Sequence, residues 1–322
     1  MHSLARFFIG IACAAALTAQ AQPATYPSKP VRLVVPFAAG GPIDVLARTL
    51  GLKLAAATGQ QFIVDNKAGG GSVIAWDHVA KANPDGYTLL VAGIGSRTIL
   101  PYVANLPFDP AKDLVGVTRL ADAASIFVAH PKSGVKNLSE LVARAKADPG
   151  KLTIAIPAPA TVTHFAATLL QRDAGIKLTE VPYKGGAPAM NAVMAGEVDL
   201  MTADIGAVIA QVQAGRLVAV AAGSPQRLPM LPQVPTATEA GYPHLVAVNV
   251  YGLFAPAGTP KEIVARLNTV VAEALRQPET REQLAKLGML AETSSVEAFE
   301  TYLREQTAKW APLAKASGYR LN

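Results

Sequence analysis

Short apolar runs alternate with stretches of helical periodicity along most of this sequence. The run Val31–Val35 predicts a buried strand, and the spacing of Leu46, Leu50 and Leu54 behind it predicts a helix with one apolar face. Further strands are expected at Phe62–Val64, Thr88–Val91, Leu152–Ile156, Leu178–Pro182, Val198–Met201 and Val218–Ala222, with helices between them at Val73–Lys81, His164–Asp173, Ala187–Ala195 and Gly206–Ala214. Strands and helices that alternate in this way form βαβ units, so the predicted fold class is α/β with mainly parallel sheet.

The chain has 322 residues, enough for about two domains, yet no linker divides it into consecutive halves. Two apolar runs, Val115–Leu120 and Val246–Tyr251, are candidates for strands that cross from one lobe to the other. If they do so, residues 22–121 and 248–322 form the first lobe, and residues 122–247 form the second. Two parallel sheets then face each other across a cleft, with a ligand expected at the carboxyl ends of their strands.

The first 21 residues have the pattern of an export signal. A positive charge at Arg6 precedes the apolar run Phe7–Leu17, and Ala19–Ala21 supplies the small residues of a cleavage site. The run is shorter than the ~20 apolar residues needed to span a membrane. A cleaved signal peptide over residues 1–21 and a mature protein in the periplasm are therefore expected.

Composition narrows the class of protein further. Apolar residues make up 51% of the chain and charged residues 16%, which excludes a disordered protein. Cleavage would remove the single cysteine, so no disulfide is expected. The mature chain would keep 28 basic and 23 acidic side chains without a long basic run, a pattern that argues against nucleic-acid binding. The mild positive charge favours an anionic ligand.

The loop Pro36–Asp44 is the first candidate anion site. It contains Gly40 and Gly41, which let a ligand approach the backbone closely, and it opens a helix whose free amides and dipole favour an anion. Asp44 either caps those amides or holds the loop through its carboxylate. The alternative for the whole segment is an ordinary strand-to-helix turn.

The loop Ile156–His164 is the second candidate, and it also joins a strand to a helix. Thr161 and Thr163 place hydroxyl groups beside the first amides of that helix. His164 has two alternative roles, contact with a ligand or a capping and packing role inside the protein.

Polar side chains follow other strands of the predicted sheets. Arg97 either forms a bidentate pair with a ligand carboxylate or is an ordinary surface arginine. Lys184 is either a ligand contact or a solvated lysine. Asp199 and Asp204 could lie near one another, which is weak evidence for acid–base chemistry.

Enzyme signatures are absent from the sequence. Neither Ser96 nor Ser224 lies in a Gly-x-Ser-x-Gly elbow, no phosphate loop ends in Gly-Lys-Ser/Thr, and Gly69–Gly71 lacks the dinucleotide spacing. The histidines at positions 2, 78, 130, 164 and 244 show no metal-ligand spacing. No catalytic residue, metal or cofactor is therefore predicted.

The segment Val34–Asp44 resembles the signature loop of the tripartite tricarboxylate transporter receptor family, also called Bug proteins. The resemblance continues in family order at Asn66–Gly71, Ala82–Leu90, Pro182–Ala189, Gly196–Leu200, Leu231–Tyr242 and Ala255–Pro260. It implies a two-lobed periplasmic binding protein of the Venus flytrap type (type II), with a ligand cleft between the lobes and two crossover strands, and not an enzyme.

The resemblance also implies a ligand class and its contacts. Ligands of the family are small organic anions: di- and tricarboxylates, acidic amino acids and aromatic acids. Two opposed loops grip one carboxylate, and carried over by position they contribute Phe37, Ala39, Gly40, Gly41, Ile43 and Asp44 from the first loop and Ala158, Thr161, Val162, Thr163 and His164 from the second. Variable residues read the far end of the ligand, and here these are Ser96, Arg97, Tyr183 and Asp204.

The second loop departs from the family pattern. Ile156–Thr161 reads Ile-Pro-Ala-Pro-Ala-Thr where a Ser- and Gly-rich segment is usual, and fewer glycines leave fewer backbone conformations. Direct charge pairing by Arg97 is one hypothesis for how the chain compensates. The expected function is capture of a carboxylate for a tripartite tricarboxylate-type transporter in the inner membrane. The alternatives are presentation of the ligand to a membrane sensor kinase, or an exported hydrolase, which would need a nucleophile–base pair in the cleft.

Overall fold

The computed structural model describes residues 26–183 and 185–321, and the predicted signal peptide lies outside them. The chain begins with β1 (Val31–Val35), α1 (Pro42–Thr58), β2 (Phe62–Asn66), α2 (Val73–Ala80), β3 (Thr88–Gly93) and α3 (Gly95–Thr98), and then enters the long strand β4 (Leu114–Ala129). The middle of the chain forms α4 (Leu138–Ala147), β5 (Thr153–Ile156), α5 (Val162–Ala174), β6 (Thr179–Pro182), α6 (Gly186–Ala195), β7 (Leu200–Asp204), α7 (Ile205–Gln213) and β8 (Val218–Ala222). It returns through β9 (Val248–Pro256) and ends with α8 (Lys261–Arg276), α9 (Pro278–Lys286), β10 (Met289–Ala291) and α10 (Val296–Ala316).

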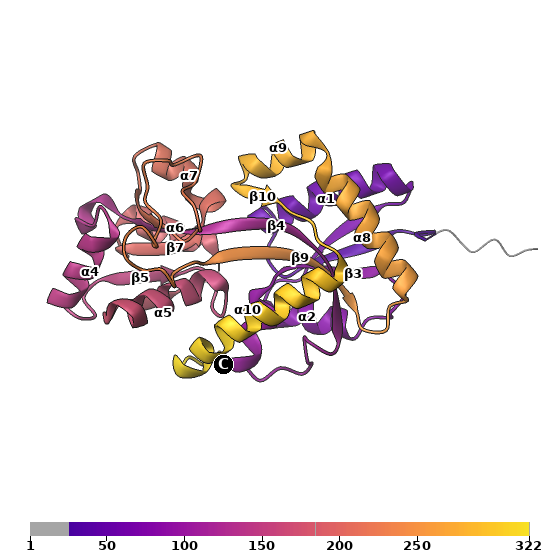
Figure 1. Ribbon diagram of the computed structural model, residues 1–322, viewed down its shortest axis with the longest axis horizontal. Helices are drawn as coiled ribbons and strands as arrows, with labels where there is room; N and C mark the ends of the chain where they lie inside the picture. The colour runs from indigo at the N-terminus through magenta and orange to yellow at the C-terminus, as the bar shows by residue number, and fades with distance from the viewer. Residues whose placement is uncertain (1–25, 184, 322) are drawn as a thin grey trace, which may run out of the picture.

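Strand pairing divides the molecule into two lobes joined by β4 and β9 (Figure 1). In the first lobe β1 lies between β2 and β3 in parallel register, and β3 pairs antiparallel with β9. In the second lobe β5 lies between β6 and β7, again in parallel, while β7 and β8 pair antiparallel with the second half of β4. The predicted two-lobed α/β fold with two crossover strands is confirmed, although both crossover strands are longer than predicted.

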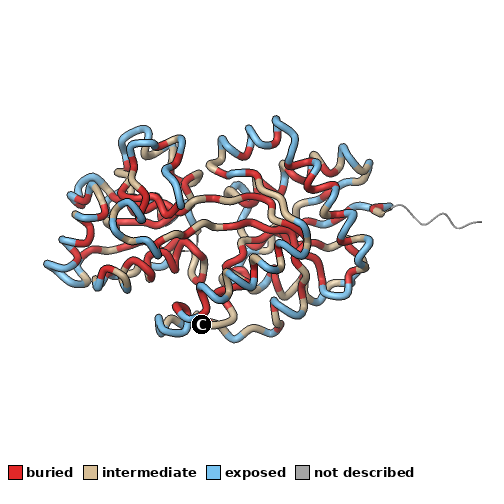
Figure 2. Tube along the Cα trace, in the orientation of Figure 1, coloured by how far each residue is buried: buried red, intermediate tan, exposed pale blue. Residues whose placement is uncertain are grey.

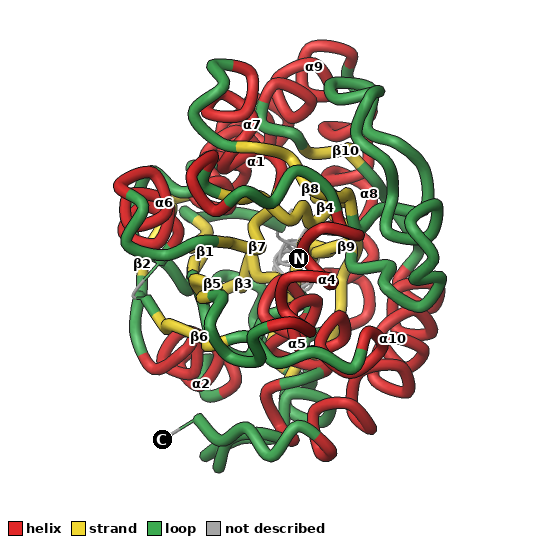
Figure 3. The backbone as a smooth tube through the Cα atoms, turned by 90° about the vertical axis from the view of Figure 1, so that its left-hand side faces the viewer, coloured by secondary structure: helices red, strands yellow, loops and turns green. Residues whose placement is uncertain are grey.

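Helices cover both faces of each sheet, as Figure 3 shows in a view turned by 90°. This arrangement explains why β1 is apolar on both faces, with Val31 and Leu33 to Val35 buried. Helix α1 begins at Pro42, a residue suited to a first helical turn, and buries the predicted apolar face of Leu46, Leu50 and Leu54.

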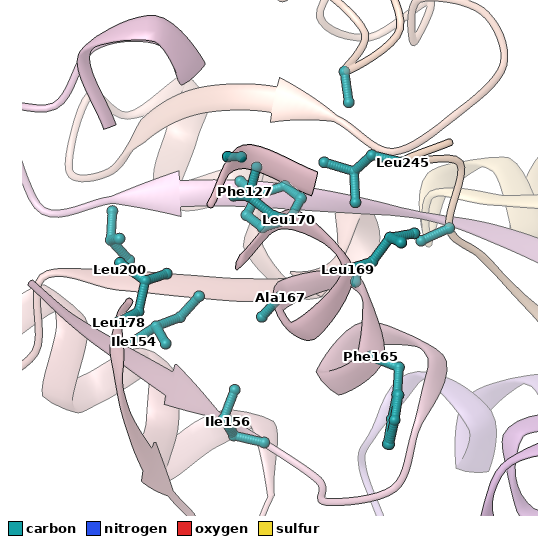
Figure 4. Packing of buried hydrophobic residues seen from close by; sticks show 14 of the residues in the cluster. Phe127, Ile154, Ile156, Phe165, Ala167, Leu169, Leu170, Leu178, Leu200 and Leu245 are labelled. Carbon is teal, nitrogen blue, oxygen red and sulfur yellow. The ribbon is translucent and has the colours of Figure 1, made fainter. Parts of the chain in front are cut away.

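Hydrophobic clusters fill each lobe, one of them includes residues of both lobes, and the buried positions follow the strands (Figure 2). In the first lobe the sheet packs against α1 and α8 on one face and against α2 and α10 on the other. In the second lobe it packs against α6 and α7 on one face and α4 and α5 on the other. Phe127, Ile154 and Phe165 belong to this last cluster (Figure 4).

Helix α10 packs against both lobes. Its first half buries Phe299 and Leu303 in the core of the first lobe. Its second half buries Trp310 and Leu313 in the cluster that includes α5 of the second lobe. Within the described part of the chain, none of the helices combines the length and the apolar character needed to cross a membrane.

Candidate functional site

The loop between β1 and α1 is held in place by the carboxylate of Asp44. Its Oδ2 accepts hydrogen bonds from the backbone N–H of Gly40 and from Nε of Arg48, both at 2.9 Å. Its Oδ1 accepts one from Nδ2 of Asn66 at 2.9 Å, and the same nitrogen donates to the carbonyl of Phe37 at 2.9 Å. Burial raises the pKa of the Asp44 carboxyl, but these hydrogen bonds outweigh it and hold the pKa below its ordinary value. Of the two roles that the sequence left open, Asp44 therefore holds the loop.

The tip of this loop is exposed at Ala39 and Gly40, and Gly40 has a φ of 88°, a conformation that suits glycine. Gly41 is the N-cap of α1, and none of the described side chains caps that helix. Phe37 is partly buried against the core and Ile43 is buried within it. The start of α1 therefore has no side-chain cap, while the apolar members of the loop anchor it.

Ser96 and Arg97, at the start of α3, make their contacts inside the protein. The hydroxyl of Ser96 lies 2.6 Å from that of Ser72. Arg97 donates from Nη2 to Oε2 of Glu300 at 2.6 Å and from Nη1 to the carbonyl of Leu114 at 3.2 Å. Only 7% of the Arg97 side chain is exposed. The guanidinium is thus bound to Glu300 of α10 and to the backbone of β4. Arg97 is therefore neither the surface residue nor the ligand contact that the sequence suggested.

The loop between β5 and α5 is stabilised by its own threonines. Thr161 is the N-cap of α5, because its Oγ1 accepts a hydrogen bond from the backbone N–H of His164 at 3.3 Å. The same hydroxyl donates to the carbonyl of Ala158 at 2.7 Å and lies 2.9 Å from Oγ1 of Thr163. The hydroxyl groups that the sequence singled out therefore shape the loop.

His164 anchors this second loop from inside the lobe. The side chain is 1% exposed, and its Nδ1 accepts a hydrogen bond from the N–H of Ala160 at 3.1 Å. The proton therefore lies on Nε2, which is 3.1 Å from Oε2 of Glu180. Ala160 has a φ of 58°, an unusual value for a residue other than glycine. The structure gives His164 the packing role, the second of the alternatives left by the sequence.

The two lobes touch where Gly95 meets the start of α5. A Cβ atom at Gly95 would lie 3.3 Å from Cα of Thr161 and 3.3 Å from the backbone nitrogen of Val162. This approach brings the β3–α3 turn of the first lobe against the second loop. Tyr183, half-buried against the second lobe's core, borders the same loop because its N–H donates to the carbonyl of Ile156 at 2.9 Å.

A carboxylate lies between the lobes at the carboxyl end of β7. Oδ2 of Asp204 accepts hydrogen bonds from the Tyr251 hydroxyl at 2.5 Å and from Nδ2 of Asn249 at 3.1 Å. Burial raises the pKa of Asp204 to about 6, and the two hydrogen bonds lower it only in part. A Cβ atom at Gly93, the last residue of β3, would lie 3.1 Å from Oδ1 of Asn249. The carboxyl ends of β3 and β7 therefore converge on β9 around Asp204.

Sequence reasoning named Asp204 but missed the residues that surround it. Asn249 and Tyr251 come from β9, and Ser125, directly opposite Asp204, comes from β4. The available signal was the spacing of Asn249 and Tyr251 at positions i and i+2, which places two polar groups on one face of an otherwise apolar strand.

The described residues offer little to a catalytic site. No group of three or more His, Cys, Asp or Glu among residues 26–183 and 185–321 is arranged to hold a metal ion. Both ring nitrogens of His164 are engaged, by the N–H of Ala160 and by Glu180, so this histidine has no nitrogen left to activate a nucleophile.

Comparison with known proteins gives consistent matches over most of the chain. Residues 46–319 match the family described as tripartite tricarboxylate transporter family receptor. Protein BugT of Bordetella pertussis is 33% identical over 316 residues, which cover 97% of each chain. A structure of an R. palustris protein with adipate has a TM-score of 0.86 at 31% identity, covering 91% of this chain and 98% of that chain. MatC from Rhodopseudomonas palustris with bound malate has a TM-score of 0.83 at 33% identity, covering 90% and 100% of the two chains.

Proposed function

Because this chain belongs to the tripartite tricarboxylate transporter receptor family, we propose that it is a periplasmic receptor that captures a small organic carboxylate between its lobes. Members of this family are solute-binding receptors and not enzymes. The observation that carries the proposal is that two relatives of the same fold were solved with adipate and with malate. Both of these ligands are dicarboxylates.

Helix N-termini supply the positive potential for one carboxylate. Helices α1 and α5 begin at the two candidate loops, and the N–H groups and dipole at a helix start favour an anion without any cationic side chain. Because Glu300 already neutralises Arg97, direct pairing of Arg97 with the ligand is not part of this proposal. We assign the carboxylate to the backbone of both loops and the far end of the ligand to the β3–α3, β6–α6 and β7–α7 turns; the contact residues proposed are Ala39, Gly40, Gly41, Ala158, Thr161, Ser96, Tyr183 and Asp204.

Capture works by closure of one lobe over the other. We place the first lobe at residues 22–121 and 248–322 and the second at residues 122–247, so that β4 and β9 act as the hinge. Closure removes the ligand from water and creates the form that a membrane partner recognises. That partner is the membrane part of a tripartite transporter, or the outer domain of a sensor kinase if the receptor serves sensing.

A thermal-shift screen of the mature protein tests the proposal. The protein is unfolded and refolded to remove any carried-over ligand and is then mixed with mono-, di-, tri- and aromatic carboxylates. An acid at about a thousand times its Kd should add about 4 kcal/mol of stability, a shift on the order of ten degrees. The amide or ester of the same acid should give no shift. A panel in which no acid raises the Tm would contradict the proposed function.

A further inference from the structure

Two adjacent polar groups in the middle of the molecule lack hydrogen-bond partners among the described residues. They are Oδ1 of Asp204 and Oγ of Ser125, and each atom is buried. Ser125 and Asp204 lie directly opposite each other in the antiparallel pairing of β4 with β7. Side chains at opposed positions point to the same face of a sheet, with Cβ atoms about 4.5–5.5 Å apart. The two unpartnered groups are therefore neighbours.

The orientation of the Asp204 carboxylate is fixed from the other side. The Tyr251 hydroxyl and the Asn249 amide both donate to Oδ2, so the carboxylate cannot rotate without losing both bonds. Oδ1 is thereby left as the free acceptor. Buried polar groups are almost always hydrogen-bonded in folded proteins, so a fixed acceptor beside an unpartnered hydroxyl is a place where a group from outside the chain can bind.

The position of this pair is that of the proposed ligand. Asp204 ends β7, and Gly93, beside Asn249, ends β3 in the other lobe. Ligands of α/β proteins bind at the carboxyl ends of parallel strands. Gly206, two residues beyond Asp204, touches the backbone of Leu287 and Gly288 in the first lobe, so closure encloses this end of β7.

The chemistry of the pair selects its partner. A carboxylate oxygen only accepts hydrogen bonds, so the group that approaches Oδ1 must donate one. A methylene group would leave the acceptor unpaired, and a second ligand carboxylate would repel it. An ammonium group both donates and neutralises the charge, and a hydroxyl group donates without neutralising it.

Resting on the proposed carboxylate function, we infer that Asp204 and Ser125 select a ligand with an amino or hydroxyl group beside its carboxylate. The receptor thus prefers an amino acid or hydroxy acid to the plain acid of the same carbon skeleton, in the order amino, hydroxyl, methylene. Asp204 is the residue that reads this substituent, and Ser125 supplies the second contact.

Calorimetric titration with matched acids tests this order. The refolded protein is titrated with propionate, lactate and alanine, with succinate, malate and aspartate, with glutarate, 2-hydroxyglutarate and glutamate, and with benzoate, salicylate and anthranilate. Within the series that binds best, the amino form should bind at least tenfold more tightly than the plain acid, as expected for one hydrogen bond to a charged group. The hydroxy form should lie between them.

Variants of the pair assign the preference to its residues. Asp204→Asn can keep both hydrogen bonds at the Oδ2 position while it replaces the free acceptor with an N–H donor, so the preference should disappear or reverse. Ser125→Ala should reduce the preference by a smaller factor. Asp148→Asn, at a carboxylate that is 59% exposed in the same lobe, is the matched control and should leave the order unchanged.

The outcomes separate this inference from the proposed function. Tight binding of a plain acid with equal or weaker binding of its amino and hydroxy forms would overturn the inference and leave the receptor function intact. A preference that survives in Asp204→Asn would also overturn it. No binding of any acid would overturn both.

Discussion

Arg97 and Glu300 form an ion pair that solvent hardly reaches from the arginine side. The guanidinium is 7% exposed and the carboxylate 21% exposed, and Oε1 of Glu300 also accepts the N–H of Gly116 at 2.7 Å. Burial alone would lower the pKa of Arg97, and Glu300 opposes that effect. The pair joins α3 to α10, and both partners also bond the backbone of β4, so its role is to hold the first lobe together.

Replacement of Arg97 with alanine should therefore cost stability and leave ligand affinity nearly unchanged. We expect a loss of about 3 kcal/mol in the free energy of unfolding, because Glu300 is left partly buried without its partner. Urea denaturation measures the loss, and calorimetry with the best acid of the screen should show less than a threefold change in Kd. Arg276→Ala, at an exposed position on α8, is the control. A tenfold weaker Kd in Arg97→Ala would place the guanidinium on the ligand after all.

Because the pKa of Asp204 is raised, the stability of the protein should depend on pH. A carboxyl group whose pKa rises from 3.8 to about 6 on folding stabilises the protein fully only below its unfolded pKa. That contribution is lost as the pH rises through about 6. Asp204→Asn cannot ionise, so its stability relative to the wild type should increase by about 2–3 kcal/mol between pH 4 and pH 7.5.

Denaturation of the ligand-free proteins at pH 4, 5.5 and 7.5 measures this difference. Tyr251 is the titratable group that faces Asp204, and burial and the carboxylate keep its pKa well above its ordinary value, so it stays neutral throughout. Asp148→Asn should show no such trend. A stability difference that does not change with pH would mean that Asp204 has an ordinary pKa in the folded protein.

At the scale of elements, His164 and Thr161 make the start of α5 rigid. Thr161 satisfies one amide of the first turn, and His164 reaches back to the N–H of Ala160, which keeps that alanine in a left-handed conformation. The loop thus gains from side-chain hydrogen bonds the conformation that glycines provide elsewhere. These hydrogen bonds hold the Pro- and Ala-rich loop in one conformation.

His164→Ala should loosen the second loop without removing a ligand contact. We expect faster hydrogen exchange at the amide of Ala160, a loss of about 2 kcal/mol in stability, and weaker carboxylate binding. His164→Asn is the matched variant, because its side-chain oxygen can replace Nδ1 as the acceptor. It should restore slow exchange and most of the affinity. Equal exchange rates in the wild type and His164→Ala would show that the loop does not depend on this hydrogen bond.

The elements also show how far sequence reasoning extends. Strand β1 was predicted with its observed bounds because its apolar run lies between Pro30 and Pro36, which interrupt regular structure on both sides. The predicted crossover strand ended at Leu120 because Asp122 and Ser125 interrupt the apolar pattern. The observed strand β4 continues to Ala129. Asp122 pairs with Arg119 and Ser125 faces Asp204. The partner of Ser125 lies on β7, far away in the sequence, and periodicity along the chain does not reveal it.

The same limit applies to the candidate site. Both loops were located from glycines, threonines and strand ends, which are local signals. The roles of Arg97 and His164 depended on Glu300 and Glu180, and a single sequence gives no indication of these contacts. The positions of the loops were therefore predictable, whereas the internal contacts that hold them were not.

At the scale of the whole molecule, contacts between lobes determine how the receptor can close. The two crossover strands connect the lobes through the middle of the molecule, and α10 packs against both lobes below them (Figure 1). On another, Gly206 at the start of α7 lies directly against the carbonyl of Leu287 and the backbone of Gly288. A Cβ atom at position 206 would overlap that carbonyl oxygen, so the present approach of the lobes requires glycine there.

Gly206→Ala should therefore hold the lobes apart and lower the affinity for the ligand without contacting it. The added methyl group cannot fit between α7 and Leu287 as the lobes lie in this structure, so closure to this arrangement should be hindered and we expect a Kd at least tenfold weaker for the best acid. The ligand-free protein should lose no stability, since alanine is the better helix former by about 1 kcal/mol. Small-angle scattering should show that the wild type becomes more compact with ligand and that the variant does so less.

Ala210→Ser, on the exposed side of the same helix, adds one heavy atom where nothing opposes it and should bind as the wild type does. If Gly206→Ala binds and compacts like this control, closure does not bring α7 against Leu287. The contact would then be incidental to capture, and the enclosure of Asp204 would have to come from the β3–α3 turn alone. If affinity and compaction fall together, the glycine at position 206 is a requirement of closure, set by a backbone that lies in the other lobe.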